Sequence, residues 1–133
     1  MFQFCNKQVF NSTVYDEICF GLKCFGSNDV DSKIKKSISM VGLNESFLFR
    51  NPYNISNGER RLVALASVLC YEPEIIILDE PTVGLDNSYK IQLMKLLKRL
   101  KNEFNVTNVL ICKDLRSVVG KGGYLRVIIY ENK

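Results

Sequence analysis

The sequence predicts an α/β fold with a mostly parallel sheet, and three neighbouring segments carry that prediction. Residues 75–78 and 109–112 are short apolar runs without the alternation of a half-buried strand, which is typical of parallel strands covered on both faces. Residues 88–101, between them, have a helical period with an apolar stripe of Ile91, Met94, Leu97 and Leu100. Strand, helix and strand in this order indicate a βαβ crossover.

Three helices are predicted before the first strand, and one more strand after the second. Residues 12–20 begin with hydroxyl side chains and place acids in the first turn, as helix starts often do. Asp31 or Ser32 is expected to cap the second helix. Residues 58–71 are apolar on nearly every side, so this third helix is expected to be buried. Residues 125–130 are predicted to form the last strand.

The composition is that of a globular protein of one-domain size. The chain has 133 residues, of which 47% are hydrophobic and 24% are charged. Its net charge of +4 is spread along helical segments, whereas nucleic-acid-binding proteins concentrate basic residues in a patch, so no nucleic-acid partner is expected. The longest nearly apolar run, residues 62–71, has about half the length of a membrane-spanning helix, and no signal peptide is visible.

Cysteine chemistry is not expected to carry the function. The five cysteines are odd in number, form no C-x-x-C pair and are accompanied by no histidine. Neither a zinc site nor a disulfide framework is therefore expected, and reduced thiols in a cytosolic protein are the natural interpretation.

The start of the third helix has a local pattern with two interpretations. Ser56 and Glu59 have the S-x-x-E spacing of a capping box, in which each side chain satisfies a backbone amide of the helix start. The plain interpretation is a well-capped helix. The functional one is an anion site, because the remaining amides and the positive end of the helix dipole point outward.

Two adjacent acids follow the first predicted strand. Asp79 and Glu80 stand at its carboxyl end, the edge where open α/β sheets place their ligands. Asp79 could orient the hydration shell of Mg²⁺, and Glu80 could accept a proton from an attacking water or position it. The alternative, that both acids only cap the following turn, has equal weight when this segment is taken alone.

Taken together, these segments resemble the ABC ATPase family. Residues 55–59 match its signature motif, residues 75–80 its Walker B strand with the catalytic glutamate, and residues 83–86 its D-loop. The resemblance implies a partial P-loop NTPase-like domain with a mostly parallel sheet core and an α-helical subdomain. It assigns residues 1–54 to the Q-loop and helical subdomain, and residues 55–133 to the signature helix, Walker B, D-loop and switch region.

The amino-terminal residues resemble the energy-coupling factor ATPases, which drive import of vitamins and metal ions. Gln3 takes the place of the Q-loop glutamine, and residues 13–21 that of the start of the helical subdomain. The resemblance therefore implies an ATP-binding transporter subunit, cytoplasmic and peripheral on the inner face of the membrane. Its partners would be a second ABC ATPase subunit and a transmembrane subunit, and its cofactors ATP and Mg²⁺.

The resemblance also implies a role for each matched residue. Glu80 and, in the position of the switch histidine, Lys113 would be catalytic. Asp79 and Gln3 would serve Mg²⁺. The expected nucleotide contacts are Gln3, Ser56, Asn57, Gly58, Glu59 and Asp86.

Three departures from the family pattern limit these roles. No G-x-x-x-x-G-K-S/T sequence is present, so the loop that binds most of the phosphate is missing, and the chain alone is expected not to hydrolyse ATP. Lys113 is a strongly hydrated point donor and a poor geometric substitute for a neutral imidazole. Asn57 replaces a glycine, a mild change because Asn tolerates left-handed backbone.

Two alternatives remain open. One is an ABC ATPase of DNA repair or translation, although neither a long heptad insertion nor a second cassette is visible. The other is a degraded, non-enzymatic module whose helical part, residues 13–53, docks on partner subunits. Its docking groove could be lined by Phe20, Phe25, Phe47, Phe49 and Tyr53, though core packing is the commoner fate of aromatic side chains.

Overall fold

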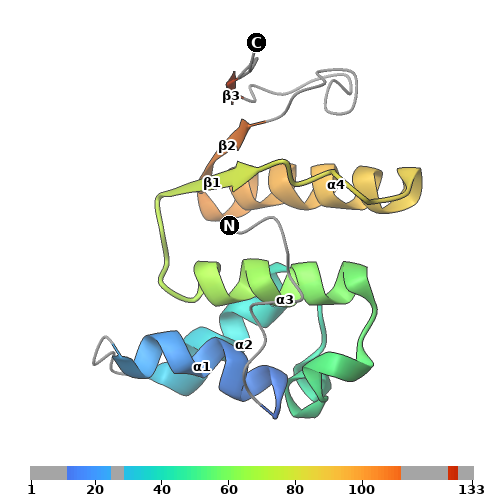
Figure 1. The fold of residues 1–133 in the computed structure, drawn as a ribbon. Coiled ribbons are helices and arrows are strands. Elements are labelled where there is room, and N and C mark those ends of the chain that lie inside the picture. Colours follow the sequence, from blue (N-terminus) through green and yellow to red (C-terminus); the bar gives the residue numbers. More distant parts are fainter. Residues whose placement is uncertain (1–11, 25–28, 112–125, 129–133) are drawn as a thin grey trace. The chain divides into compact units, whose positions relative to one another are not determined.

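The computed structural model describes residues 12–24, 29–111 and 126–128 (Figure 1). The chain divides into two compact units, a helical unit within Phe4–Pro73 and a sheet unit made of Met1–Gln3 and Glu74–Lys133. The predicted division after residue 54 follows the motifs and stays a prediction. Among the helices of the described ranges, none combines the length and apolar character needed to cross a membrane.

The helical unit contains three α-helices and two short 3₁₀ helices. They are α1 (Val14–Cys24), α2 (Val30–Met40), η2 (Glu45–Phe49), η3 (Pro52–Asn54) and α3 (Asn57–Leu69). The predicted hydroxyl cap of the first helix is confirmed, because Thr13 Oγ1 accepts a hydrogen bond from the Asp16 amide at 3.1 Å. Helix α3 packs against both α1 and α2, so it forms the centre of this unit.

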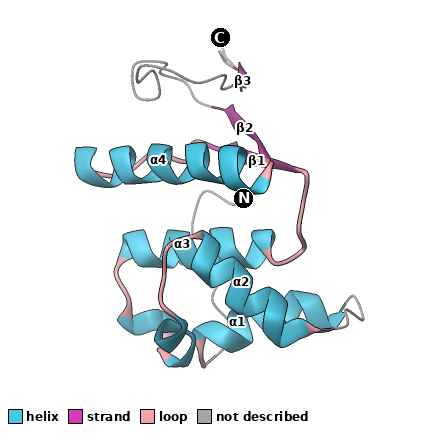
Figure 2. Cartoon of the chain, turned by 180° about the vertical axis from the view of Figure 1, so that it is seen from behind, coloured by secondary structure: helices cyan, strands magenta, loops and turns pink. Residues whose placement is uncertain are grey.

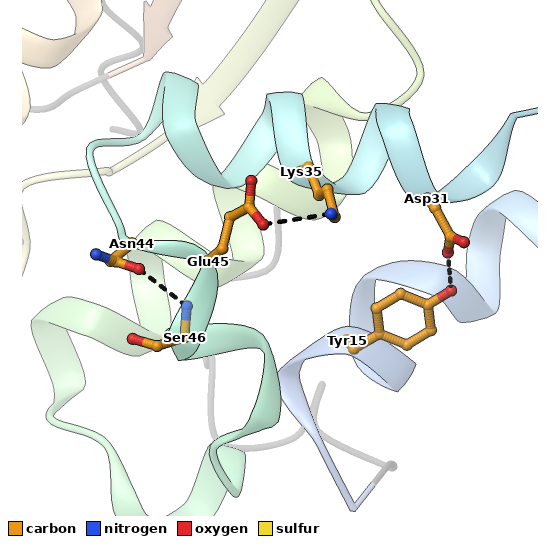
Figure 3. Close-up of polar contacts among 6 residues, drawn as sticks. All are labelled: Tyr15, Asp31, Lys35, Asn44, Glu45 and Ser46. Atoms are coloured by element: carbon orange, nitrogen blue, oxygen red, sulfur yellow. Dashed lines mark hydrogen bonds and ion pairs between the residues drawn. The ribbon is translucent and has the colours of Figure 1, made fainter.

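The predicted start of the second helix is wrong. Helix α2 begins at Val30, and its cap position is Asp29, which has a left-handed backbone and makes no side-chain cap bond. Asp31 already lies inside the first turn of α2, past the cap position, and its carboxylate accepts a hydrogen bond from the Tyr15 hydroxyl of α1 (Figure 3).

Helix α3 is buried on one side only, which corrects the expectation of burial all round. Val63, Leu65, Ala66 and Leu69 are buried, whereas Val68 keeps 39% of its surface exposed. The buried set recurs at helical spacing and meets α1 and α2, so the remaining side of α3 lies outside the core of the helical unit.

Polar contacts join α2 to its neighbours at the surface of the helical unit. Lys35 Nζ lies 3.3 Å from Glu45 Oε2 of η2 (Figure 3), and Lys36 Nζ lies 2.5 Å from Glu72 Oε1. Both pairs are exposed, and such ion pairs contribute about 0–1 kcal/mol because water screens them. The apolar core of this unit, not its ion pairs, therefore supplies most of its stability.

The two described buried cysteines behave as apolar side chains. Cys19 and Cys70 are free thiols with 1% of their surface exposed. Burial raises the pKa of the Cys70 thiol to about 11, so the thiolate is scarce at neutral pH. The predicted reduced state of the cysteines stays a prediction.

The sheet unit confirms the βαβ crossover. Its elements are β1 (Ile75–Asp79), α4 (Asn87–Phe104), β2 (Thr107–Ile111) and β3 (Arg126–Ile128). The strands pair in the order β1-β2-β3, and both pairings are parallel. Figure 2 shows α4 next to β1 within the sheet unit. The predicted α/β class and parallel sheet are therefore confirmed.

Strand β1 is covered on one face, although burial on both was predicted. Ile76 and Leu78 are 3% exposed, whereas Ile75 and Ile77 are each 58% exposed. An apolar run predicts burial only where a second layer exists, and among the described residues α4 supplies one layer alone.

The buried stripe of α4 also differs from the predicted one. Leu96, Leu97 and Leu100 are buried, while Ile91 is 56% exposed. The side-chain amide of Asn108, buried in β2, donates to the Leu97 carbonyl at 2.8 Å and so ties the helix to the sheet. The covered part of α4 is therefore its carboxyl-terminal half.

Candidate functional site

The start of α3 forms the predicted capping box. Ser56 Oγ accepts from the Glu59 amide at 3.2 Å, and Glu59 Oε2 accepts from the Ser56 amide at 2.8 Å. Ser56 and Asn57 are exposed, and Ile55 beside them is buried at 7%. A helix start leaves four amides without helical partners, and the capping box satisfies two of them, so those of Asn57 and Gly58 remain for a ligand.

Hydrogen bonds of Asn51 and Arg60 hold the loop that precedes the capped turn at Ser56. Asn51 Oδ1 accepts from the Tyr53 amide at 2.9 Å and so caps η3. Arg60, in the first turn of α3, donates to the carbonyls of Pro52 at 3.3 Å and Tyr53 at 3.5 Å. These contacts fix the approach of the chain to Ser56. Sequence reasoning missed Arg60, and only its place beside the signature motif could have pointed to it.

Replacing Glu59 by alanine is expected to lower the stability of the helical unit by about 1 kcal/mol at pH 7. The backbone hydrogen bond from Ser56 lowers the pKa of the Glu59 carboxyl from its ordinary value of 4.5. A carboxyl group whose pKa is lowered by folding stabilises the folded state above its unfolded-state pKa. This stabilisation is lost as pH falls through the folded-state pKa. In urea unfolding between pH 7 and pH 3, the free energies of unfolding of the wild type and of Glu59→Ala should therefore converge as the pH falls.

Glu45→Ala is the matched control for the capping box. Glu45 also lies in a first helical turn, but its contact to Lys35 joins two exposed side chains. The control is expected to change stability by less than about 0.5 kcal/mol. Equal losses of stability in Glu59→Ala and Glu45→Ala would show that the Ser56–Glu59 capping box does not stabilise the start of α3.

The acidic pair lies at the carboxyl end of β1. Asp79 is the last residue of the strand and is exposed, and Glu80 follows it half-buried. Glu80 has a left-handed backbone with φ of 46°, and its amide donates to the Ile111 carbonyl at 2.8 Å. This uncommon conformation is held by the end of β2, and such positions often occur at functional sites.

A tight turn leads from Glu80 to α4. Thr82 is buried at 4%, and Gly84 has φ of 72°, a conformation that glycine adopts without strain. Asp86 then caps α4, because its Oδ1 accepts from the Tyr89 amide at 2.9 Å. The sequence pattern named Asp86 as a nucleotide contact, and this cap gives it a structural role that the motif alone did not indicate.

The described site residues fall into two groups. Ser56, Asn57, Gly58 and Glu59 lie in the helical unit, and Asp79, Glu80 and Asp86 lie in the sheet unit. Gln3 and Lys113 lie outside the described residues, so their predicted roles stay predictions. Within the ranges that the structure describes, no three acidic, cysteine or histidine side chains gather as a metal site.

The fold and these two motifs are those of part of an ABC ATPase domain. The structure is similar to cbiO1 of Clostridium perfringens, part of the ABC transporter complex cbiONQ, with a TM-score of 0.74 and 30% identity over 80% of this chain and 43% of that chain. The sequence model of the ABC transporter family matches residues 1–83. The chain therefore belongs to the ABC transporter family.

Three individual proteins are similar to this chain over most of its length. The energy-coupling factor transporter ATP-binding protein EcfA2 of Enterococcus faecalis is 40% identical over 130 residues, which are 96% of this chain and 45% of the relative. EcfA2 of Listeria monocytogenes is 43% identical over 117 residues, 86% of this chain and 41% of the relative. The bacterial ABC transporter cassette MJ0796, solved bound to ADP and phosphate, is 28% identical with a TM-score of 0.69 over 88% of this chain and 52% of that chain. The chain thus spans less than half the length of these EcfA2 proteins.

Proposed function

We propose that this chain is the carboxyl-terminal part of an energy-coupling factor type ATP-binding subunit, coupling ATP binding and hydrolysis to import of a small solute such as a vitamin or a metal ion. The observation that carries the proposal is that one chain presents both an exposed, capped signature turn at Ser56 and an exposed acid, Asp79, at the carboxyl end of β1. The likeness to EcfA2 proteins supports the importer class.

The signature turn would act on a nucleotide held by a second ATPase subunit. The Asn57 and Gly58 amides and the Ser56 hydroxyl present hydrogen-bond donors at the positive end of a helix dipole. Because the capping box already fixes the turn, these donors would not have to reorganise when a γ-phosphate approaches. Ser56 and Gly58 would therefore complete the site of the partner.

The end of β1 would serve the nucleotide bound within the same cassette. One exposed carboxylate fits Mg²⁺, which usually binds one or two carboxylates, several waters and substrate phosphates. Asp79 would hold that hydrated ion, which supplies charge neutralisation between the phosphates. Glu80 would accept the proton of the attacking water or orient it, with its backbone fixed by Ile111.

The partners that follow are a second ABC ATPase subunit and a transmembrane subunit, with the chain peripheral on the cytoplasmic face of the membrane. The described aromatic side chains are compatible with docking on such a subunit. Phe20, Phe49 and Tyr53 are 64%, 82% and 62% exposed, whereas Phe47 is buried at 6% and is excluded from any docking groove. Phe25 lies outside the described residues.

A hybrid cassette can test whether the signature turn acts in trans. The hybrid is the Enterococcus faecalis relative with the region that this chain matches replaced by residues 1–133. Glu80→Gln and Ser56→Arg hybrids are each expected to lose ATP turnover. A mixture of the two should regain turnover, because mixed dimers contain one site with an intact glutamate facing an intact signature turn.

Two results would contradict the proposal. If the mixture stays as inactive as its components while sedimentation shows mixed dimers, the turn does not act across subunits. If the isolated chain turns over ATP and Glu80→Gln abolishes that activity, the chain needs no partner for phosphate binding. A mixture of wild type and the double variant Ser56→Arg, Glu80→Gln provides the control for subunit exchange.

A further inference from the structure

Arg60 bonds to the chain at Ser56 and again at the loop that leads to Ser56. Its backbone amide donates to the Ser56 carbonyl at 2.9 Å, which is the first hydrogen bond of helix α3. Its side chain reaches back along the sequence, where Nε donates to the Pro52 carbonyl at 3.3 Å and Nη2 to the Tyr53 carbonyl at 3.5 Å. One residue therefore joins the start of α3 to the segment before it.

The two carbonyls that the Arg60 side chain binds belong to a very short helix. Helix η3 has three residues, Pro52–Asn54, and a helix of this length leaves most of its carbonyls to donors outside it. A guanidinium suits this task because its planar fork can donate to two carbonyls at once. A lysine ammonium is a point donor and does not match two carbonyls in this way.

The side-chain bonds of Arg60 differ from the other contacts of this segment in what they connect. The capping box of Ser56 and Glu59 closes within the first turn of α3. The bond from the Tyr53 amide to Asn51 Oδ1 closes within η3. The bonds from Arg60 to the η3 carbonyls run between the two helices, so they set how η3 and the signature turn are oriented to each other.

The orientation of the signature turn matters for the chemistry proposed for it. Ser56 has an extended backbone, with ψ of 160°, and stands just before the helical part of α3. Its direction therefore depends on the residues that precede it as well as on the helix. A displacement of about 1 Å at a group that positions a substrate can lower a rate by about 100-fold.

We propose that Arg60 is a positioning residue for the signature turn. Through the carbonyls of Pro52 and Tyr53 it holds Ser56 in the orientation that completes the nucleotide site of the partner subunit. This inference rests on the proposed function, in which Ser56 acts across subunits. Arg60 acts through the main chain, and the role requires no contact between its guanidinium and the nucleotide.

Mixed dimers of hybrid cassettes test this role because each contains one working site. In the mixture of Ser56→Arg and Glu80→Gln hybrids, the Glu80→Gln subunit supplies the intact signature turn. Arg60→Ala placed in that subunit is expected to lower ATP turnover by at least about tenfold. The same change in the Ser56→Arg subunit should lower turnover much less, since the turn of that subunit is already inactive. A general folding defect would lower turnover from either subunit.

Two further variants separate positioning from the loss of a positive charge. Arg60→Lys keeps the charge but lacks the fork, so it should restore only part of the turnover. Lys36→Ala is the matched control, because Lys36 is also a bonded cation of the helical unit, with Nζ 2.5 Å from Glu72 Oε1. Lys36→Ala in the subunit with the intact signature turn should keep the turnover of the unmodified mixture. Sedimentation shows whether each mixture forms mixed dimers.

Hydrogen exchange in the full chain gives a second measurement that needs no nucleotide. The amides of Ser56 and Glu59 are bonded within the capping box. Arg60→Ala should speed their exchange by at least about threefold, because the turn opens more often when the loop before it is released. Lys36→Ala should leave the exchange of these two amides unchanged.

Two results would overturn the positioning role. They are equal losses of turnover from the two placements of Arg60→Ala, and unchanged exchange of the Ser56 and Glu59 amides in that variant. If Arg60→Ala does not form mixed dimers, Arg60→Lys in each subunit decides by the same comparison. If the parent mixture regains no turnover while Arg60→Ala still speeds exchange, Arg60 positions the turn and the proposed function is contradicted. The two proposals can therefore fail separately.

Discussion

Glu80→Gln in the hybrid cassette is expected to lower kcat for ATP hydrolysis by about 100-fold or more, with little change in nucleotide binding. The amide keeps the size and hydrogen bonding of the side chain but cannot accept the proton of an attacking water. The Glu80 backbone is held in its left-handed conformation by the Ile111 carbonyl, so the substitution should not displace the turn. Steady-state phosphate release and equilibrium binding of labelled ATP separate the two effects.

Glu74→Gln is the control for the glutamate. Glu74 lies just before β1, at the end of the strand opposite to Glu80. Its backbone carbonyl accepts a hydrogen bond from the Thr107 amide, and this bond does not involve the side chain that is replaced. This variant should keep turnover within about twofold of the wild-type hybrid. A Glu80→Gln hybrid with unchanged kcat would remove Glu80 from the catalytic role.

Leu110→Ala is expected to destabilise the sheet unit by about 2–5 kcal/mol. Leu110 is fully buried in β2, pairs with Leu78 in register and shares a face with Ile76 under α4. Removing its side chain leaves a cavity between helix and sheet that the paired strands cannot close. Hydrogen exchange of the β1 and β2 amides in the isolated chain measures the loss directly.

Ile91→Ala gives the comparison for this core substitution. Ile91 belongs to the stripe that the sequence assigned to the core, yet it is 56% exposed. Its truncation should cost less than about 0.5 kcal/mol. A larger loss at Ile91 than at Leu110 would mean that the helix packs on the sheet through the predicted stripe.

The parts of the candidate site that depend on residues close together in the sequence could be predicted. The capping box needs only Ser56 and Glu59 three residues apart, and its hydrogen bonds form within one turn. The acids after β1 followed from an apolar run that ends in Asp79 and Glu80. The hydrogen bonds of Arg60 could not be predicted, since its two carbonyl partners depend on how η3 folds back toward α3.

The sequence by itself determined the α/β class, the parallel crossover between β1 and β2, and the capped turn at Ser56. Each of these depends on neighbouring residues and on the hydrophobic period along the chain. The tertiary structure alone decided which side of each apolar segment is buried. Ile75 and Ile76 are equally apolar, but only Ile76 is buried, and helix α2 begins before Asp31, whose carboxylate bonds to Tyr15 of another helix. Burial and long-range contacts depend on which elements pack together, and a single segment does not contain that information.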